Sequence, residues 1–139
     1  SGDLLEYGAT PYCGDAQLEE WPQTLEKIKA LGAVCAVPGR GNALFNEKKV
    51  NESIASTTHY VTMLLDTAKA AVAKGLDLTE AYKEIHGLMK PIFGDYVIFE
   101  HCMPFNVTRA YEEAKGIKHP NIWTAEKDKE MWFALQASI

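Results

Sequence analysis

Hydrophobic residues recur every three or four positions over most of the chain, which is typical of helices that bury one face. The first such run extends from Leu18 to Leu31 and is expected to end at Gly32. A second run begins after Asn46, whose side chain can cap a helix, and continues to about Gly75. Two helices are therefore predicted within the first 75 residues.

Three further helices are predicted after residue 75. Asp77 and Glu80 have the spacing of a capping box, and the helix they open is expected to stop before Pro91. Another is expected over residues 104–114, with Gly116 as its cap, and Thr124 is expected to cap the last one. From about residue 46 onward we therefore expect helices only.

The first third of the chain has a different pattern. The continuous apolar run Ala33–Val37 ends at Pro38 and Gly39, as expected of a buried strand. Residues 2–7 resemble the end of a strand that enters a turn. The order strand, helix, strand is typical of a parallel α/β sheet. We therefore expect an α/β segment at residues 1–45 and a helical region at residues 46–139.

Composition narrows the classes of function. The 139 residues suit one domain, and a net charge of −5 argues against nucleic-acid binding, which needs a basic surface. No apolar run reaches the length of a membrane span, and no signal-like leader precedes Asp3. The cysteines Cys13, Cys35 and Cys102 are widely spaced and odd in number, which favours a reducing compartment, the cytoplasm.

Two positions at the ends of the expected strands are candidates for chemistry. Asp3 lies where a strand meets a loop, and a carboxylate there can bind a hard metal ion or simply form a turn. Pro38, Gly39 and Gly41 break the second strand and expose the side chain of Arg40 at the sheet edge. Adjacent parallel strands would place both loops at the same end of the sheet.

These residues also resemble a known family. The resemblance is carried by Gly2-Asp3-Leu4-Leu5, Pro11, Gly14-Asp15, Trp21, Leu25 and Val37-Pro38-Gly39-x-Gly41. The pattern is similar to the second half of the metallo-β-lactamase superfamily, and the helices after residue 45 are similar to the C-terminal additions of glyoxalase-II-like members. The stretch from Tyr96 to Phe105 resembles a bacterial subgroup. The resemblance implies the C-terminal half of an αββα fold.

The resemblance also implies a chemistry. Asp3 would be a ligand of zinc or another divalent metal in a longer parent protein. That parent would hydrolyse an ester, a thioester or a lactam-like bond in a small-molecule substrate. The chain itself would be a fragment of such an enzyme.

The chain departs from the family pattern in two ways. The main metal motif, His-x-His-x-Asp-His, is absent, because no two of His59, His86, His101 and His119 are close enough to imitate it. The isolated chain is therefore expected to bind metal weakly and to be inactive. Arg40 also stands where the family loop has a histidine, and a guanidinium cannot bind a metal ion. Its charge either replaces part of a second metal's charge, by pairing with Asp3 or binding a substrate anion, or forms an ion pair that fixes the loop.

Two further expectations concern the second half of the chain and its partners. Cys102 is expected to be packed core, whereas His101 could face the cleft and supply the ligand missing at position 40. The alternative function is a non-enzymatic helical interaction module. In both interpretations an exposed partial sheet favours a homo-oligomer or a domain-swapped dimer.

Overall fold

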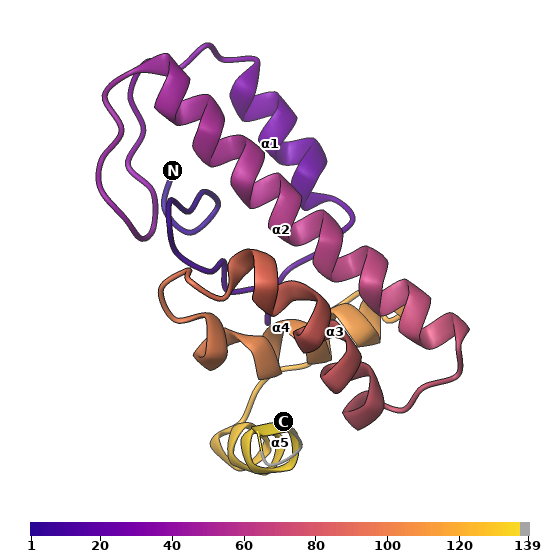
Figure 1. The fold of residues 1–139 in the computed structure, drawn as a ribbon. Coiled ribbons are helices and arrows are strands. Elements are labelled where there is room, and N and C mark those ends of the chain that lie inside the picture. The colour runs from indigo at the N-terminus through magenta and orange to yellow at the C-terminus, as the bar shows by residue number, and fades with distance from the viewer. Residues whose placement is uncertain (137–139) are drawn as a thin grey trace.

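The computed structural model describes residues 1–136, which form five helices joined by irregular segments (Figure 1). These helices are α1 (Trp21–Lys29), α2 (Glu47–Ala73), α3 (Leu78–Phe93), α4 (Phe99–Ala114) and α5 (Ala125–Gln136). Their order agrees with the five helical patterns in the sequence. Among them, no helix is both long and apolar enough to cross a bilayer.

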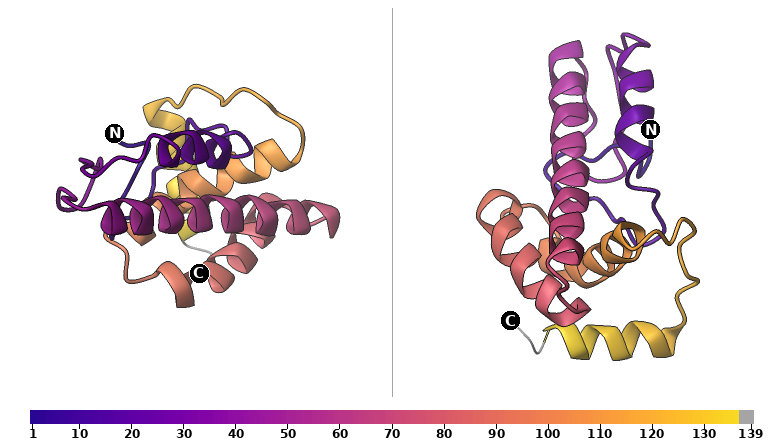
Figure 2. Two further views of the ribbon diagram at one scale, coloured as in Figure 1. Left: turned by 90° about the horizontal axis from the view of Figure 1, so that it is seen from above. Right: turned by 90° about the vertical axis from the view of Figure 1, so that its right-hand side faces the viewer.

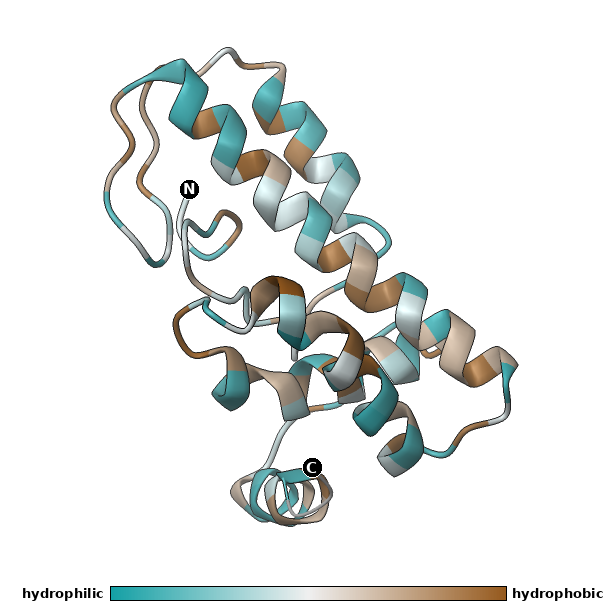
Figure 3. Cartoon of the chain, viewed as in Figure 1, coloured by the Kyte–Doolittle hydropathy of each residue, from teal (hydrophilic) through white to brown (hydrophobic). Residues whose placement is uncertain are grey.

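The 27-residue helix α2 is the element against which α1, α3 and α4 pack. It begins at Asn46, whose side-chain oxygen accepts a hydrogen bond from the Lys49 N–H at 2.9 Å, as expected of a helix cap. Hydrophobic and hydrophilic residues alternate along it in bands (Figure 3). Helix α1 lies beside one half of α2, and α3 and α4 pack against the other half (Figure 2). Helix α5 crosses α3 and α4 through buried Met131 and Leu135.

The predicted helix starts at Asp77 and Thr124 are confirmed. Asp77 and Glu80 form a reciprocal capping box, and the Lys127 N–H donates to Thr124 Oγ1 at 3.2 Å. The predicted stop before Pro91 is wrong, because α3 continues through Pro91 to the buried Phe93. Pro91 lies in the last turn, where only one intrahelical hydrogen bond is lost.

Helix α4 also contains a proline and starts earlier than predicted. It begins at Phe99, and Pro104 lies within it. Because proline has no N–H, the carbonyl of Glu100, four residues earlier, loses its helical donor. The side-chain amide of Gln136 in α5 donates to that carbonyl at 3.1 Å. The exposed backbone oxygen thus becomes part of the contact between α4 and α5.

The expected α/β fold is wrong for this chain. In residues 1–136 the only β pairings are three isolated bridges, Gly2 with Pro38, Ala9 with Val97, and Ala36 with Leu44. A strand needs a partner over several residues, but the first segment turns at once, where the Leu5 N–H donates to the Gly2 carbonyl at 3.1 Å. The fold class is therefore helical, and neither the N-terminal strands nor half of an αββα sandwich is present.

The apolar run at residues 33–37 is likewise not a buried strand. Val34 is 65% exposed and Val37 is 61% exposed. Within the described residues, Ala36 of this run bridges Leu44 alone and the adjoining Pro38 bridges Gly2 alone, so no sheet forms that a second layer could cover. Periodicity identified an apolar segment correctly, but it did not show whether the chain buries it.

Residues from both parts of the chain share one hydrophobic core. Leu5, Leu18, Leu25 and Leu44 from the first part are at most 1% exposed, and they pack in the same cluster as α2, α3 and α4. The expected division at residue 45 stays a prediction, and the last three residues of its second part lie outside the described residues.

Arg109 in α4 fastens three separate segments together. Its guanidinium is fully buried, and its Nε donates to the Ala16 carbonyl at 2.6 Å. Its terminal nitrogens donate to the carbonyls of Ile117 and Lys118, at 3.0 and 3.1 Å, and to the Glu113 carboxylate at 3.1 Å. Glu113 in turn accepts from the backbone N–H groups of Leu18 and Glu19 at 2.9 and 3.0 Å. The segment before α1 and the segment after α4 are therefore both hydrogen-bonded to the ion pair between Arg109 and Glu113.

We expect Arg109→Met to lower the free energy of unfolding by about 3–5 kcal/mol, because it leaves the largely buried Glu113 carboxylate without its cation and three carbonyls without their donor. Urea denaturation measures this. Lys115→Met, at the exposed C-cap of the same helix, should change stability by about 0.5 kcal/mol or less. A loss below about 1 kcal/mol for Arg109→Met would contradict the assignment.

Candidate functional site

Asp3 and the loop of residues 37–41 lie side by side, as the sequence analysis expected. Gly2 and Pro38 form a parallel bridge, in which the Gly2 N–H donates to the Val37 carbonyl at 3.3 Å. The Gly39 N–H donates to the Leu5 carbonyl at 3.0 Å. Segments more than thirty residues apart in sequence therefore meet through their backbones, although no sheet forms around them.

Glycine is required at two positions of this contact. A Cβ atom at Gly39 would collide with the Asp3 carboxylate and lie 2.8 Å from the Asp3 Cα. Gly41 has φ +97°, and a Cβ there would collide with the Tyr7 carbonyl. The two glycines let the loop approach the N-terminal segment closely enough for the Tyr7 N–H to donate to the Arg40 carbonyl at 3.2 Å.

Arg40 pairs with Glu6 and not with Asp3. Its Nη1 lies 2.8 Å from Glu6 Oε1, and its backbone N–H donates to Glu6 Oε2 at 2.6 Å. The sequence analysis left two roles for Arg40, a substitute for metal charge and an ion pair that fixes the loop. The structure contains such an ion pair, with Glu6. Its side chain remains 36% exposed. A role in binding a substrate anion stays a prediction.

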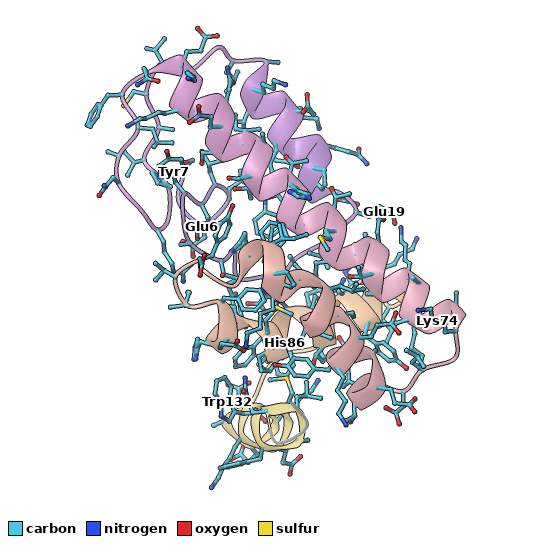
Figure 4. All side chains as sticks on the ribbon, in the orientation of Figure 1. Glu6, Tyr7, Glu19, Lys74, His86 and Trp132 are labelled. Atoms are coloured by element: carbon cyan, nitrogen blue, oxygen red, sulfur yellow. The ribbon has the colours of Figure 1, made fainter. Side chains whose placement is uncertain are left out.

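Glu6 is the residue of this site that sequence reasoning missed. It is buried below the loop, and α2 holds its backbone (Figure 4). Ser53 Oγ and Thr57 Oγ1 donate to the Glu6 carbonyl at 2.8 and 3.2 Å. Because Ser53 and Thr57 are four residues apart, they lie on one face of α2. A glutamate among apolar residues was the available signal, but its partner could not be inferred from sequence.

Burial raises the pKa of Glu6 above its ordinary value of 4.5, against the opposing effect of the Arg40 N–H and guanidinium. Cys102 of α4 lies within electrostatic reach of this pair. Burial raises the pKa of its thiol to about 11, so the thiol stays protonated at neutral pH. At 1% exposure, Cys102 is confirmed as packed core.

Asp3 borders a cavity of about 400 Å³ between the N-terminal segment and α1. Tyr12 and Trp21 contribute aromatic rings to its wall, and Asp15 and Glu20 contribute two more carboxylates. The indole N–H of Trp21 donates to the Leu4 carbonyl at 3.0 Å, which fixes that ring. Among the described residues, no hydrogen bond or ion pair engages the Asp3 carboxylate, which is exposed.

His101 lies in another environment. Its ring packs against Phe105 and against Trp132 of α5, with centroids 6.0 and 5.5 Å apart. Within residues 1–136, no hydrogen bond or ring contact joins it to Asp3 or Arg40. Its role as a replacement ligand stays a prediction.

The donor set around Asp3 is incomplete for a metal ion. In the part of the chain that the structure describes, no group of three or more histidine, cysteine, aspartate or glutamate side chains could hold one. Both oxygens of the nearby Glu6 carboxylate already accept hydrogen bonds from Arg40. Asp3 therefore offers one ligand, and the described residues do not by themselves form a metal site.

Comparisons with known proteins add no identification. No family model matches the chain, and no curated protein matches its sequence.

The raised pKa of Glu6 predicts a pH dependence of stability. A carboxyl group with a higher pKa in the folded state binds more protons there, so stability falls as pH rises from 4.5 through its folded-state pKa. The difference in free energy of unfolding between the wild type and Glu6→Gln should decrease over that interval. Urea titrations at a series of pH values measure it.

Glu100→Gln is the control with the opposite sign. Desolvation acts to raise the pKa of Glu100, but hydrogen bonds from Lys90 and His86 hold it below 4.5. The stabilisation from this group is present above 4.5 and is lost as pH falls through its folded-state pKa. A Glu6→Gln difference that stayed constant with pH would refute the assigned pKa direction.

Proposed function

We propose that this chain contributes Asp3 to the active site of a metal-dependent hydrolase that cleaves an ester, a thioester or a lactam-like bond. The observation that carries the proposal is the contact between Asp3 and the Pro38–Gly41 loop, since the resemblance in sequence rests on these same two segments. In this proposal Asp3 binds zinc or another divalent metal, and the remaining ligands come from outside the 139 residues.

The electrostatics around Asp3 support this role. Arg40 is the cation nearest in sequence to the contact, and its charge is taken up by the buried Glu6. Asp3 consequently keeps an accessible negative charge without an ion-pair partner, as a metal ligand requires. The small-molecule substrate would occupy the cavity beside Asp3, where Tyr12 and Trp21 offer apolar contact.

Other parts of the proposal follow from the same interpretation. The isolated chain, with one ligand, binds metal weakly and does not turn over substrate. The three cysteines, none in a disulfide within the described residues, suit the reducing cytoplasm. Arg40 stabilises negative charge on the substrate through the exposed part of its guanidinium.

The test is the metal content of the longest protein that the gene encodes, purified without chelator and measured by mass spectrometry of the metal. We expect bound zinc or a similar ion, and Asp3→Asn should remove at least half of one equivalent, because it replaces an anionic ligand by a neutral one. Hydrolysis of a thioester substrate should fall by about a hundredfold or more.

Asp15→Asn is the matched control, because Asp15 is an exposed aspartate on the same cavity. It should leave the metal content unchanged. A metal-free protein, or equal metal content in the Asp3→Asn variant and the wild type, would refute the proposal. The non-enzymatic helical interaction module would then be the remaining interpretation. If the longer protein had no His-x-His-x-Asp-His segment, that absence would also favour the interaction module.

A further inference from the structure

We propose that the cavity beside Asp3 binds an organic cation, a small molecule that carries an ammonium group on an apolar body. The cavity of about 400 Å³ lies between the N-terminal segment and α1, and its wall combines three carboxylates with two aromatic rings. The inference deepens the proposed function, and it rests on that function for the view that the substrate occupies this cavity. It adds that the substrate is positively charged.

The charge on the cavity wall is negative and has no partner. Asp3, Asp15 and Glu20 line the cavity, whereas no lysine, arginine or histidine of the described residues does. Within residues 1–136, no hydrogen bond or ion pair engages any of these three carboxylates. The chain as a whole has a net charge of −5, so three negative charges around one cavity are a strong local concentration. A positively charged ligand relieves their mutual repulsion, and an anion adds to it.

Two aromatic rings give the same cavity a surface that attracts cations. The face of an aromatic ring is electron-rich, and ammonium groups bind over it. The Trp21 ring is held by the hydrogen bond from its indole N–H to the Leu4 carbonyl. The Tyr12 ring packs against Phe105, with centroids 5.8 Å apart. Because both rings are fixed before a ligand arrives, its binding costs little side-chain entropy.

A fourth carboxylate acts on this wall from outside the cavity. Asp128 of α5 lies within electrostatic reach of Tyr12, and its Oδ1 atom is buried without a hydrogen-bond partner among the described residues. A buried carboxylate oxygen without a partner is uncommon and typically marks the place of an ion, a water molecule or a ligand. Burial, together with Asp15 and Asp128, raises the pKa of Tyr12 to about 12. Its hydroxyl therefore stays neutral at neutral pH, and its oxygen can accept a hydrogen bond from an ammonium group.

The size of the cavity and the distribution of its charges define the class of ligand. A volume of about 400 Å³ is within the range of small-molecule sites and holds an amine with one ring or a short chain. In the proposed hydrolase the metal ion occupies Asp3, so Asp15 and Glu20 remain for the ammonium group. The bond that is cleaved then belongs to an ester, a thioester or a lactam-like compound that also carries an amine.

Isothermal titration calorimetry of the 139-residue chain, without metal and at about pH 7, tests the inference with phenethylamine as the probe. The amine of this probe is protonated at that pH. The comparison probe is 3-phenylpropionate, which has the same ring and the opposite charge. We expect a dissociation constant below about 1 mM for phenethylamine and at least about tenfold weaker binding of 3-phenylpropionate. Raising the salt concentration from about 20 to about 500 mM should weaken the binding of phenethylamine.

Glu20→Gln should weaken the binding of phenethylamine about threefold, and its combination with Asp15→Asn about tenfold, because each removes one carboxylate from the wall. Glu26→Gln is the matched control. Glu26 is an exposed glutamate of α1 that does not line this cavity. Its replacement removes the same charge and should change the dissociation constant by less than about 1.5-fold. Circular dichroism checks that every variant keeps its helices.

No measurable binding of phenethylamine at about 10 mM, equal affinity for the two probes, or equal effects of Glu20→Gln and Glu26→Gln would overturn the inference. These outcomes are separate from the test of the hydrolase. A longer protein without metal would refute the role of Asp3 as a ligand, but it would not alter these binding measurements, which use no metal. Conversely, if phenethylamine did not bind, the metal content of the Asp3→Asn variant would still decide the proposed function.

Discussion

Arg109 carries a full charge inside a helical core, and the segments around it are arranged to satisfy that charge. Its donors reach Glu113 on the same helix and the carbonyls of Ala16, Ile117 and Lys118. A buried guanidinium without partners costs several kcal/mol, so the two irregular segments have to remain where their carbonyls meet it. Arg109 therefore helps to place α1 on one side of α4 and the connection to α5 on the other.

The N-terminal segment depends on a second polar anchor. Glu6 is buried against α2, where Ser53 and Thr57 hold its carbonyl, and its carboxylate holds the backbone and side chain of Arg40. The anchor brings Pro38–Gly41 against Asp3 without a β-sheet. The most accessible carboxylate of the contact is left without a partner, and for this reason we place the candidate chemistry at Asp3 and not at the ion pair.

The candidate site belongs to the irregular N-terminal part of the molecule, where Asp3 and its cavity offer a charged group to a ligand. Residues 1–45 contain sequence typical of strands, but the described residues form only isolated bridges there and no sheet. This part is nevertheless held to the helices by a shared core, because Leu5, Leu18 and Leu25 pack in the same cluster as α2, α3 and α4.

The sequence by itself determined the order of the helices and the starts of three of them, because these signals are local. Caps at Asn46, Asp77 and Thr124 act within three residues, and the apolar spacing that follows them describes one face of one helix. It also indicated that Asp3 and the Pro38–Gly41 loop are neighbours. Tertiary structure decided the rest. Pro104 remains in a helix because Gln136 satisfies the carbonyl it frees, and Arg40 pairs with Glu6 because α2 holds Glu6 beneath it. The apolar run at residues 33–37 stays exposed because strand formation needs partners that no local pattern can supply.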